Sequence, residues 1–292
     1  MIDVIIPAYR GLAETRRCVE SVLEAPVRVA HEVVVIDDAS PEPGLAEWLR
    51  DLAGGGRITL RVHGRNAGFV ASANEGLGLH PNRDVLLLNS DTVVAGDWLD
   101  RLAGHLARDP RAGTVTPFSN NATICSYPLF AQANALPEGT TPAALDAAFA
   151  RANAGEAVEI PTAVGFCMLI ARRCLAEVGA FDEAAFGRGY GEEVDFCMRA
   201  ARAGWRHLLA ADTFVFHEGE VSFGGGAQDI RNRAQAIVDE RYPEFQVRVR
   251  AFLESDPPRP WRERATAALR SPCASRPAGF LDRLRGLLPG RR

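Results

Sequence analysis

The 292-residue sequence contains no lysine, so all 33 of its basic residues are arginines. No apolar run approaches the roughly 20 residues that a transmembrane helix needs. The N-terminal residues also lack the basic segment and long apolar core of a signal peptide. Together these absences predict a cytoplasmic protein.

Several catalytic and nucleotide-binding signatures are missing as well. No G-x-G-x-x-G follows the first apolar strand, so the fingerprint of dinucleotide binding is absent. Neither a P-loop, a G-x-S-x-G nor an H-E-x-x-H motif occurs. The six cysteines show no C-x-x-C spacing and most have apolar neighbours, which predicts reduced thiols in the core.

The composition, with 47% apolar and 24% charged residues, is that of a globular protein with one large domain. Its net charge of -4 is unevenly spread. Residues 259–292 hold nine arginines against two acids, whereas the preceding part carries a balance of -11. Nucleic acids bind basic surfaces, so the acidic main part predicts no nucleic-acid partner.

Strand and helix patterns alternate over the first 117 residues. We predict strands at 4–6, 33–36, 58–62, 85–88 and 114–116, and helices at 12–23, 45–52, 69–79 and 98–106. Such alternation predicts an α/β fold with a mostly parallel, Rossmann-like central sheet flanked by helices. Beyond a loop-rich stretch we predict strands at 162–171 and 205–216, and helices at 173–178, 192–203 and 228–254, the last interrupted at Pro243.

Polar or turn-forming residues follow four of the predicted strands. Because the carboxyl ends of parallel strands share one edge of the sheet, ligands bind there. The four clusters are Pro7-Ala8-Tyr9, Asp37-Asp38, Arg65-Asn66 and Asn89-Ser90-Asp91. Their convergence predicts a binding site at this edge.

Two of these clusters contain acids at the end of a buried strand. Asn89 and Asp91 carry oxygens two residues apart, which suits Mg²⁺ or Mn²⁺ bound beside a diphosphate. The alternative is a turn in which they cap the next helix. Asp37 and Asp38 are costly at the end of an apolar strand unless they bind something. Their alternative is a helix cap through Asp38 or Ser40.

Further along the chain, Glu192, Glu193 and Asp195 open a predicted helix. One of these carboxylates could act as a general base, although acids also favour helix N-termini and Asp195 can pair with Arg199. Glu192 and Glu193 diverge by about 100°, so they cannot both face one substrate atom. His217 ends an apolar strand, and a single histidine becomes a ligand only in the company of other ligands.

Seven sequence blocks, taken in order, resemble the family 2 glycosyltransferases, which have the GT-A nucleotide-sugar-binding fold. The blocks are 4–9, 35–40, 65–69 with Asn74, 88–91, 165–168, 189–197 and His217. The resemblance covers about residues 1–250. It is closest to the bacterial branch that builds O-antigen, capsule and other surface polysaccharides, including rhamnosyltransferase-like members.

The resemblance implies an inverting transfer of sugar from a nucleotide-diphosphate sugar to an acceptor hydroxyl. The implied nucleotide-sugar residues are Pro7, Ala8, Tyr9, Asp37, Asp38, Arg65, Asn66, Gly68, Asn74, Asn89 and Ser90. Asp91 would be the metal-binding acid of a D-x-D-like motif, and His217 a further ligand to a divalent cation (Mn²⁺ or Mg²⁺) or to the diphosphate. Glu193 would be the base, with Glu192 as the alternative.

The chain departs from the family pattern twice, because Asn89 replaces the first Asp of D-x-D and Glu193 replaces the usual catalytic Asp. The resemblance places Gly165, Phe166 and the loop 118–137 at the acceptor, a glycan or lipid-linked glycan. Other interpretations are a degenerate GT-A nucleotide-binding or scaffold protein and a sugar nucleotidyltransferase. A sugar nucleotidyltransferase needs a glycine-rich basic loop after the first strand, which residues 9–12 match poorly.

We expect a GT-A domain over 1–255, with a nucleotide-sugar-binding half at 1–117 and an acceptor and catalytic half at 118–255. Residues 256–292 are expected to form an arginine-rich tail. One helical face of this tail is apolar and comprises Phe280, Leu281, Leu284, Leu287 and Leu288. This pattern is typical of peripheral contact with the inner face of the plasma membrane; a disordered or partner-docking tail is the alternative.

Overall fold

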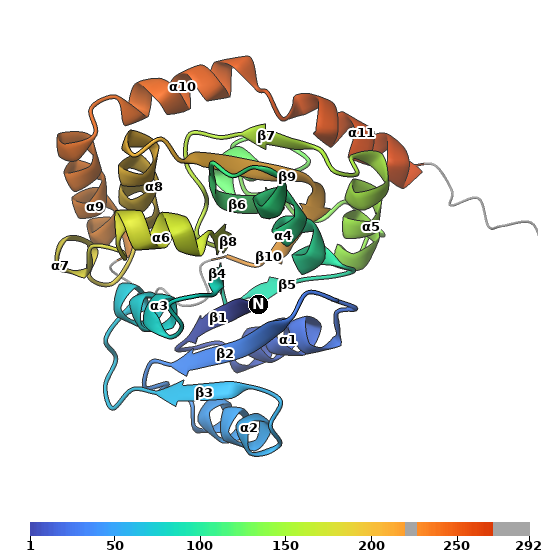
Figure 1. The fold of residues 1–292 in the computed structure, drawn as a ribbon. Coiled ribbons are helices and arrows are strands. Elements are labelled where there is room, and N and C mark those ends of the chain that lie inside the picture. The colour runs from blue at the N-terminus through green and yellow to red at the C-terminus, as the bar shows by residue number, and fades with distance from the viewer. Residues whose placement is uncertain (220–226, 271–292) are drawn as a thin grey trace, which may run out of the picture.

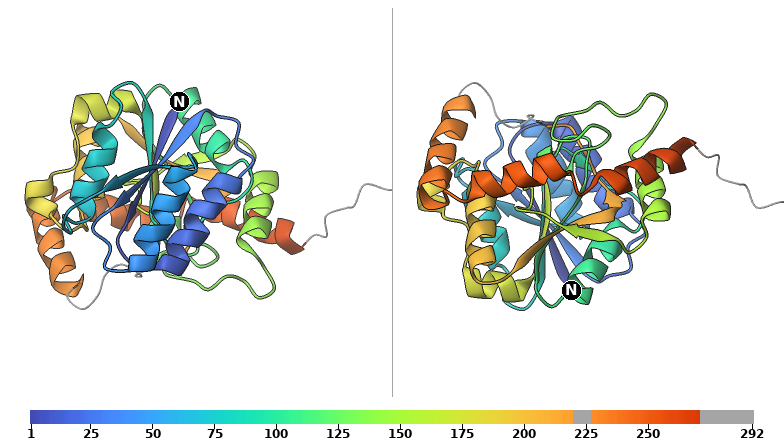
Figure 2. Two further views of the ribbon diagram at one scale, coloured as in Figure 1. Left: turned by 90° about the horizontal axis from the view of Figure 1, so that it is seen from below. Right: turned by 90° about the horizontal axis from the view of Figure 1, so that it is seen from above.

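The computed structural model describes residues 1–219 and 227–270. An eight-stranded sheet with the order β3-β2-β1-β4-β8-β6-β9-β7 lies at the centre and is flanked by helices (Figures 1 and 2). Its strands are β1 (Ile2–Ala8), β2 (His31–Asp37), β3 (Thr59–Val62), β4 (Asp84–Leu88), β6 (Ala112–Phe118), β7 (Ala157–Glu159), β8 (Cys167–Ile170) and β9 (Arg206–Phe214). A second, two-stranded sheet pairs β5 (Thr92–Val93) with β10 (Phe216–His217).

The helices lie mostly where the apolar periodicity predicts them. They are α1 (Leu12–Glu24), α2 (Pro43–Gly54), α3 (Phe69–Gly78), α4 (Trp98–Arg108), α5 (Pro142–Ala152), α6 (Arg172–Val178), α7 (Glu183–Phe186), α8 (Glu192–Arg202), α9 (Ala227–Arg241), α10 (Phe245–Ser255) and α11 (Arg259–Arg270). Within the described ranges, none of them combines the length and apolar character that a membrane span requires.

The sheet is mostly parallel, as the alternating pattern predicts. Strands β1, β2, β3 and β4 are mutually parallel, and so are β6 and β9. Strand β8 runs antiparallel between β4 and β6 and joins the two parallel groups. The apolar runs of β1, β2 and β4 are buried because helices or loops cover both faces of these strands.

Helix α3 approaches β1 closely because Gly76 has no side chain. A Cβ at this position would overlap the side chain of Ile5. The glycine therefore lets the helix that follows the predicted nucleotide residues rest directly on the sheet.

The structure corrects two of the predicted strands. The strand expected at 162–171 is formed only by β8, because the N–H groups of Ala163 and Val164 bond to side chains of Cys197 and Thr116 instead of a neighbouring strand. The strand expected at 205–216 is divided at Val215 into β9 and β10. Strand β7, which is only three residues long, was not predicted.

The first part of the predicted tail is a helix that packs on the domain. Helix α11 lies against α5 (Figure 1), and the Arg262 guanidinium donates to Asp256 at 2.7 Å. The Thr266 hydroxyl lies 3.1 Å from that of Tyr127. The boundary at residue 255 stays a prediction, and the apolar face expected at 280–288 lies outside the described residues.

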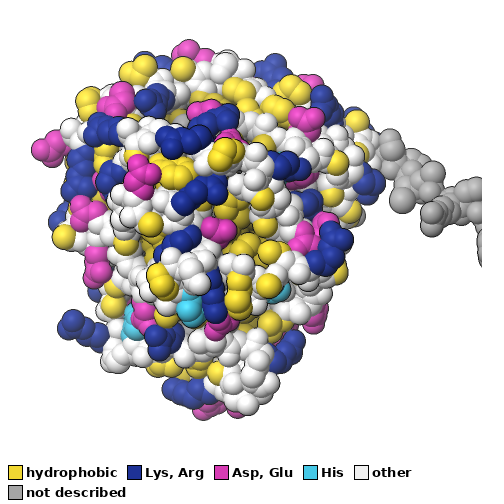
Figure 3. Space-filling model, in the orientation of Figure 1, with side chains coloured by type: hydrophobic (Ala, Val, Ile, Leu, Met, Phe, Trp, Pro, Cys, Tyr) yellow, Lys and Arg dark blue, Asp and Glu magenta, His cyan; other side chains and the backbone are white. Residues whose placement is uncertain are grey.

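Arginine and acidic side chains are interspersed on the face of the molecule shown in Figure 3. Charge of one sign does not cover this face as a whole.

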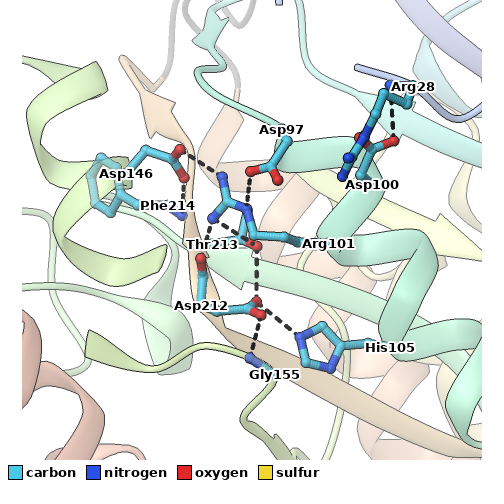
Figure 4. A network of polar contacts seen from close by, with 10 residues as sticks. All are labelled: Arg28, Asp97, Asp100, Arg101, His105, Asp146, Gly155, Asp212, Thr213 and Phe214. Carbon is cyan, nitrogen blue, oxygen red and sulfur yellow. Dashed lines mark hydrogen bonds and ion pairs between the residues drawn. The ribbon is translucent and has the colours of Figure 1, made fainter. Parts of the chain in front are cut away.

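A buried polar network joins α4, α5 and β9 (Figure 4). Arg101 of α4 donates to Asp146 of α5 at 2.6 Å and to the Asp212 carbonyl of β9. The side chains of Arg101 and Asp146 are only 12% and 3% exposed. One turn further along α4, His105 donates from Nε2 to Asp212 at 2.9 Å, since Arg108 donates to its Nδ1. The network fixes the strand that leads into β10.

Removing the Arg101 guanidinium should strongly destabilise the fold. Arg101→Met leaves the Asp146 carboxylate buried and unpaired, so we expect the free energy of unfolding in urea to fall by about 3–5 kcal/mol. Arg28→Ala is the matched control, because the Arg28 side chain is 84% exposed in its pair with Asp100. The free energy of unfolding of Arg28→Ala should fall by only about 0–1 kcal/mol. Equal losses in the two variants would contradict the importance of the buried pair.

A second network anchors the chain between β3 and α3. Asp38 accepts hydrogen bonds from the N–H groups of Ala67 and Gly68 at 2.7 and 2.8 Å. His63 lies 2.7 Å from Asp38 through Nδ1 and 2.7 Å from Glu75 through Nε2. Burial lowers the pKa of His63, but the bonds to the two carboxylates outweigh it and raise the pKa above its usual 6.5.

This arrangement predicts that stability depends on pH through His63. Because the pKa is raised in the folded state, the stabilisation is fully present below about pH 6.5 and is lost as the pH rises through the folded value. We expect the difference in free energy of unfolding between the wild type and His63→Gln to shrink from about pH 6 to pH 9. Glu75→Gln, which removes one carboxylate, should reduce this pH dependence. If the difference in free energy of unfolding between the wild type and His63→Gln stays constant from about pH 6 to pH 9, the role of His63 is contradicted.

Candidate active site

The ends of β1, β2 and β4 meet at one edge of the sheet, as the strand-end clusters predict. Ala8 lies beside Asp37 in the register of β1 and β2, and Asn89 follows the end of β4. Asp37 accepts the Ser40 N–H at 2.7 Å, while Asp38 holds the loop before α3. Both carboxylates are buried. The backbone N–H groups that donate to them offset the free-energy cost of burying these charges at the edge of the sheet.

The remaining predicted nucleotide residues differ in exposure. Pro7, Tyr9 and Asn66 are half-buried, Ala8 and Ser90 are buried, and Arg65 is exposed. The guanidinium of Arg10 lies 5.3 Å from the centre of the Tyr9 ring.

Gly68 and Asn74 make contacts with the segment that precedes α8. Gly68 has a φ of +95°, and a Cβ there would lie 3.2 Å from the backbone of Arg188, so a close approach requires glycine. The Asn74 amide donates to the Phe181 carbonyl and accepts its N–H, both at 3.0 Å. Asn74 thus bonds to protein backbone, and its contact with a nucleotide stays a prediction.

The pairing of β10 with β5 brings Asp91 and His217 together. His217 pairs with Thr92 in the register of the two strands. Its Nε2 lies 3.4 Å from Asp91 Oδ1 and 3.4 Å from the Asn89 amide nitrogen. The other Asp91 oxygen accepts the Gly219 N–H at 3.0 Å. Two predicted metal ligands and Asn89 therefore lie at one place.

The His217 ring is held on its other sides. Its Nδ1 lies 2.7 Å from the carbonyl oxygen of Asn121, which can only accept, so Nδ1 carries a proton. Phe166 stacks on the ring with 5.2 Å between the ring centres. Nε2 is consequently the nitrogen that faces Asp91.

Asp91 and His217 shift each other's pKa. Burial raises the pKa of Asp91, but the bond and charge of His217 and the N–H of Gly219 outweigh it, so the net pKa is lowered. Burial lowers the pKa of His217, but Asp91 and the Asn121 carbonyl outweigh it, so the net pKa is raised. Each side chain therefore favours the charged form of the other.

The donor set fits a divalent cation. One carboxylate and one imidazole are ligands that Mn²⁺ accepts, and carboxylates beside phosphates suit Mg²⁺. The separation of 3.4 Å also exceeds the usual 2.7–2.9 Å of a charge-assisted bond. Asp3, Glu32 and His80 form another acidic group, but there Arg83 donates to Asp3 at 2.9 Å and to Glu32 at 2.6 Å and supplies the positive charge.

Glu193 lies beside the segment that carries Phe166. A Cβ built on Gly165 would lie 4.0 Å from Glu193 Cγ, and Gly165 precedes the Phe166 that stacks on His217. Gly191, with a φ of +84°, begins helix α8 at this point. The predicted base and acceptor residues are thus neighbours.

Glu192 and Glu193 each have one buried oxygen without a hydrogen-bond partner among the described residues. Burial raises the pKa of both, and the charge of Glu193 raises that of Glu192 further. Because the two carboxyl groups interact, ionisation of one disfavours ionisation of the other. Asp195 instead bonds to Arg199, as its spacing predicts, and also to Arg241 and Tyr242.

Sequence reasoning missed Asn120 and Asn121, which contact His217. They follow β6 directly, so the rule of polar residues after a strand would have found them. That rule was applied to four strands but not to the strand predicted at 114–116.

Comparison with known proteins agrees with the sequence motifs. An N-acetylglucosaminyl-diphospho-decaprenol L-rhamnosyltransferase of Mycobacterium tuberculosis (strain ATCC 25618 / H37Rv) is 29% identical over 150 residues, 48% of each chain. The succinoglycan biosynthesis protein ExoO of Rhizobium meliloti (strain 1021) is 30% identical over 153 residues, 50% of this chain and 42% of that protein. The matches span less than half of these relatives and confirm the resemblance to the bacterial, rhamnosyltransferase-like branch.

The fold and the family are also established. The crystal structure of GalNAc-T7 with UDP, GalNAc and Mn²⁺ has a TM-score of 0.61 at 18% identity, covering 91% of this chain and 54% of that chain. This likeness confirms the expected GT-A fold. Residues 3–179 match the family described as Glycosyl transferase family 2, a range that includes Asp38, Asn89 and Asp91. The chain therefore belongs to glycosyl transferase family 2.

Proposed function

We propose that this protein is an inverting glycosyltransferase that acts in the synthesis of a bacterial surface polysaccharide. It moves a sugar from a nucleotide-diphosphate sugar to an acceptor hydroxyl. The observation that carries the proposal is the arrangement around residues 165–166, where Phe166 stacks on His217 of the Asp91–His217 pair and Gly165 lies next to Glu193.

The nucleotide binds at the carboxyl edge of β1, β2 and β4. Pro7, Ala8 and Tyr9 line the base and ribose, and Asp38 contacts the base with Asp37 beside it. Exposed Arg65 is a cation near this edge. The support for this placement is the convergence of the strand ends and the burial of both aspartates.

The diphosphate lies at Asp91 and His217, with Asn89 and Ser90 beside them. A divalent cation held by Asp91 and His217 would supply positive charge that stabilises the leaving nucleoside diphosphate. The Asn121 carbonyl keeps the proton of His217 on Nδ1, which leaves Nε2 free for such a ligand role.

Glu193 is the general base. It takes the proton of the acceptor hydroxyl, and the oxygen attacks the anomeric carbon in line as the bond to the diphosphate breaks. The attack from the opposite side inverts the configuration. Burial supports this role, because it raises the pKa of Glu193 toward the working pH of a base. Glu192 does not compete for the same atom, because successive helical residues diverge by about 100°.

The acceptor, a glycan or lipid-linked glycan, binds at Gly165, Phe166 and the loop 118–137. We infer a cytoplasmic location with peripheral contact at the inner face of the plasma membrane through the apolar face at 280–288. A lipid-linked acceptor would be found at the same surface. Liposome flotation with and without residues 271–292 tests this location, and equal flotation would contradict it.

Removing the Asp91 carboxylate should weaken metal-dependent nucleotide binding. Calorimetry with UDP, dTDP and GDP, each with and without Mn²⁺, should reveal a preference for one nucleotide that depends on the metal. We expect Asp91→Ala to weaken this binding by about tenfold or more, which corresponds to about 1.4 kcal/mol. Asp51→Ala, at an exposed position of α2, is the control. Absence of binding to all three nucleotides would contradict the proposed donor site.

Exchanging the two glutamates separately should identify the base. We expect Glu193→Gln to lower the rate of sugar transfer by about 10²–10⁴-fold, because an amide cannot take the proton. Nucleotide affinity should be retained, since Glu193 does not contact the Asp91–His217 pair. Glu192→Gln, the neighbouring exchange, should lower the rate much less. A larger loss in Glu192→Gln would transfer the role to Glu192.

A further inference from the structure

The side chain of Asn120 pairs with the backbone of His217 as a neighbouring strand would. Its Oδ1 accepts the His217 N–H at 2.9 Å, and its Nδ2 donates to the His217 carbonyl at 2.9 Å. Asn120 is only 5% exposed. A primary amide offers one acceptor and one donor side by side, so this residue type matches the backbone N–H and C=O of one residue.

This pairing completes the short strand β10. Backbone groups of successive strand residues point to opposite sides. On one side, the Glu218 N–H bonds to the Asp91 carbonyl at 3.0 Å. On the other side, His217 has no strand beside it in the described part of the chain, and the Asn120 amide takes that place. His217 is thus fixed between Asp91 and Asn120.

Asn121 adds a contact to the ring of the same histidine, but through its backbone. Its carbonyl oxygen accepts the Nδ1 proton at 2.7 Å. Among the described residues, the Asn121 side chain donates to the Glu218 carbonyl at 3.5 Å and packs closely against Gly219. Two adjacent asparagines therefore act on His217 in different ways, one through its amide and the other through its main chain.

The position of Asn120 is itself fixed by the loop that follows β6. The Asn134 N–H donates to the Asn120 carbonyl at 2.9 Å, and Nδ2 of Asn120 donates to the Asn134 carbonyl at 3.2 Å. The Asn134 amide in turn donates to the Leu129 carbonyl at 2.8 Å. The amide that holds His217 is therefore rigid.

We propose that Asn120 is a positioning residue that sets the affinity of Asp91 and His217 for a divalent cation. The inference rests on the proposed function, which gives these two residues the metal. Partners that orient a metal-ligating histidine typically account for 10–100-fold in metal affinity. Without Asn120, the His217 backbone loses its partners on one side, and Nε2 is no longer held toward Asp91.

Titration of the full chain with Mn²⁺, followed by the electron paramagnetic resonance signal of free Mn²⁺, tests the inference without sugar transfer. We expect Asn120→Ala to weaken Mn²⁺ binding by about 10–100-fold. Asn121→Ala is the matched control and should stay within about twofold, because its carbonyl is retained. Asn120→Ser keeps a hydroxyl that can bond to one of the two His217 backbone groups, so its loss of Mn²⁺ affinity should be smaller. This variant replaces Asn120→Ala in the test if Asn120→Ala does not fold.

The variant Asp91→Ala distinguishes a failure of the positioning role from a failure of the proposed metal site. If Asp91→Ala weakens Mn²⁺ binding but folded Asn120→Ala and Asn120→Ser bind like the wild type, the positioning role is wrong and the proposed metal site stands. Equal losses in the Asn120 and Asn121 variants would also overturn the positioning role. If the wild type does not bind Mn²⁺, or Asp91→Ala binds it equally well, the metal site and the inference both fail.

Discussion

The pairing of β5 with β10 is the contact on which the candidate site depends. It consists of two residues on each strand, with Phe216 opposite Val93 and His217 opposite Thr92. Asp91 follows β4, the last of the four parallel strands β1–β4, whereas His217 follows β9 and lies beyond α8 in the chain. A shift of the register by one residue would turn the His217 side chain to the opposite face. Phe166 would then lose the ring on which it stacks.

So short a pairing is stable only because the surrounding structure fixes both of its strands. Strand β9 ends just before β10, and Arg101 holds that end through the Asp212 carbonyl while Asp146 accepts the Phe214 N–H at 3.1 Å. On the other strand, the Thr92 hydroxyl donates to the Asn89 carbonyl at 2.8 Å. The buried network of Arg101 and Asp146 and the polar residues at the edge of the sheet therefore both fix the pairing of β5 with β10.

The sequence was sufficient to predict the sheet and the edge where the site lies, because unbroken apolar runs and polar strand ends are local patterns. Asp91 and His217 could be proposed as partners only through the family resemblance, since nothing local reports a contact between residues so far apart. The antiparallel direction of β8 had no local pattern either. Helix α11 was interpreted as tail because of its arginines, although Trp261, Ala265 and Leu269 recur at helical spacing and pack against the core. Asn120 is a polar residue after a predicted strand, so a local pattern marks it, but its contact with the His217 backbone leaves no trace in sequence.

The treatment of buried acids distinguishes the candidate base from the rest of the molecule. Buried carboxylates are normally satisfied by cations or N–H donors. Asp38 has two N–H groups and His63, and Asp195 has two arginines and a tyrosine hydroxyl. Glu192 and Glu193 each keep an oxygen without a partner in the described residues, at the first turn of one helix. A fold that pairs its structural acids this fully would lose stability by leaving two others unpaired. The unpaired oxygens of Glu192 and Glu193 therefore favour the proposal that one of them, Glu193, takes a substrate proton.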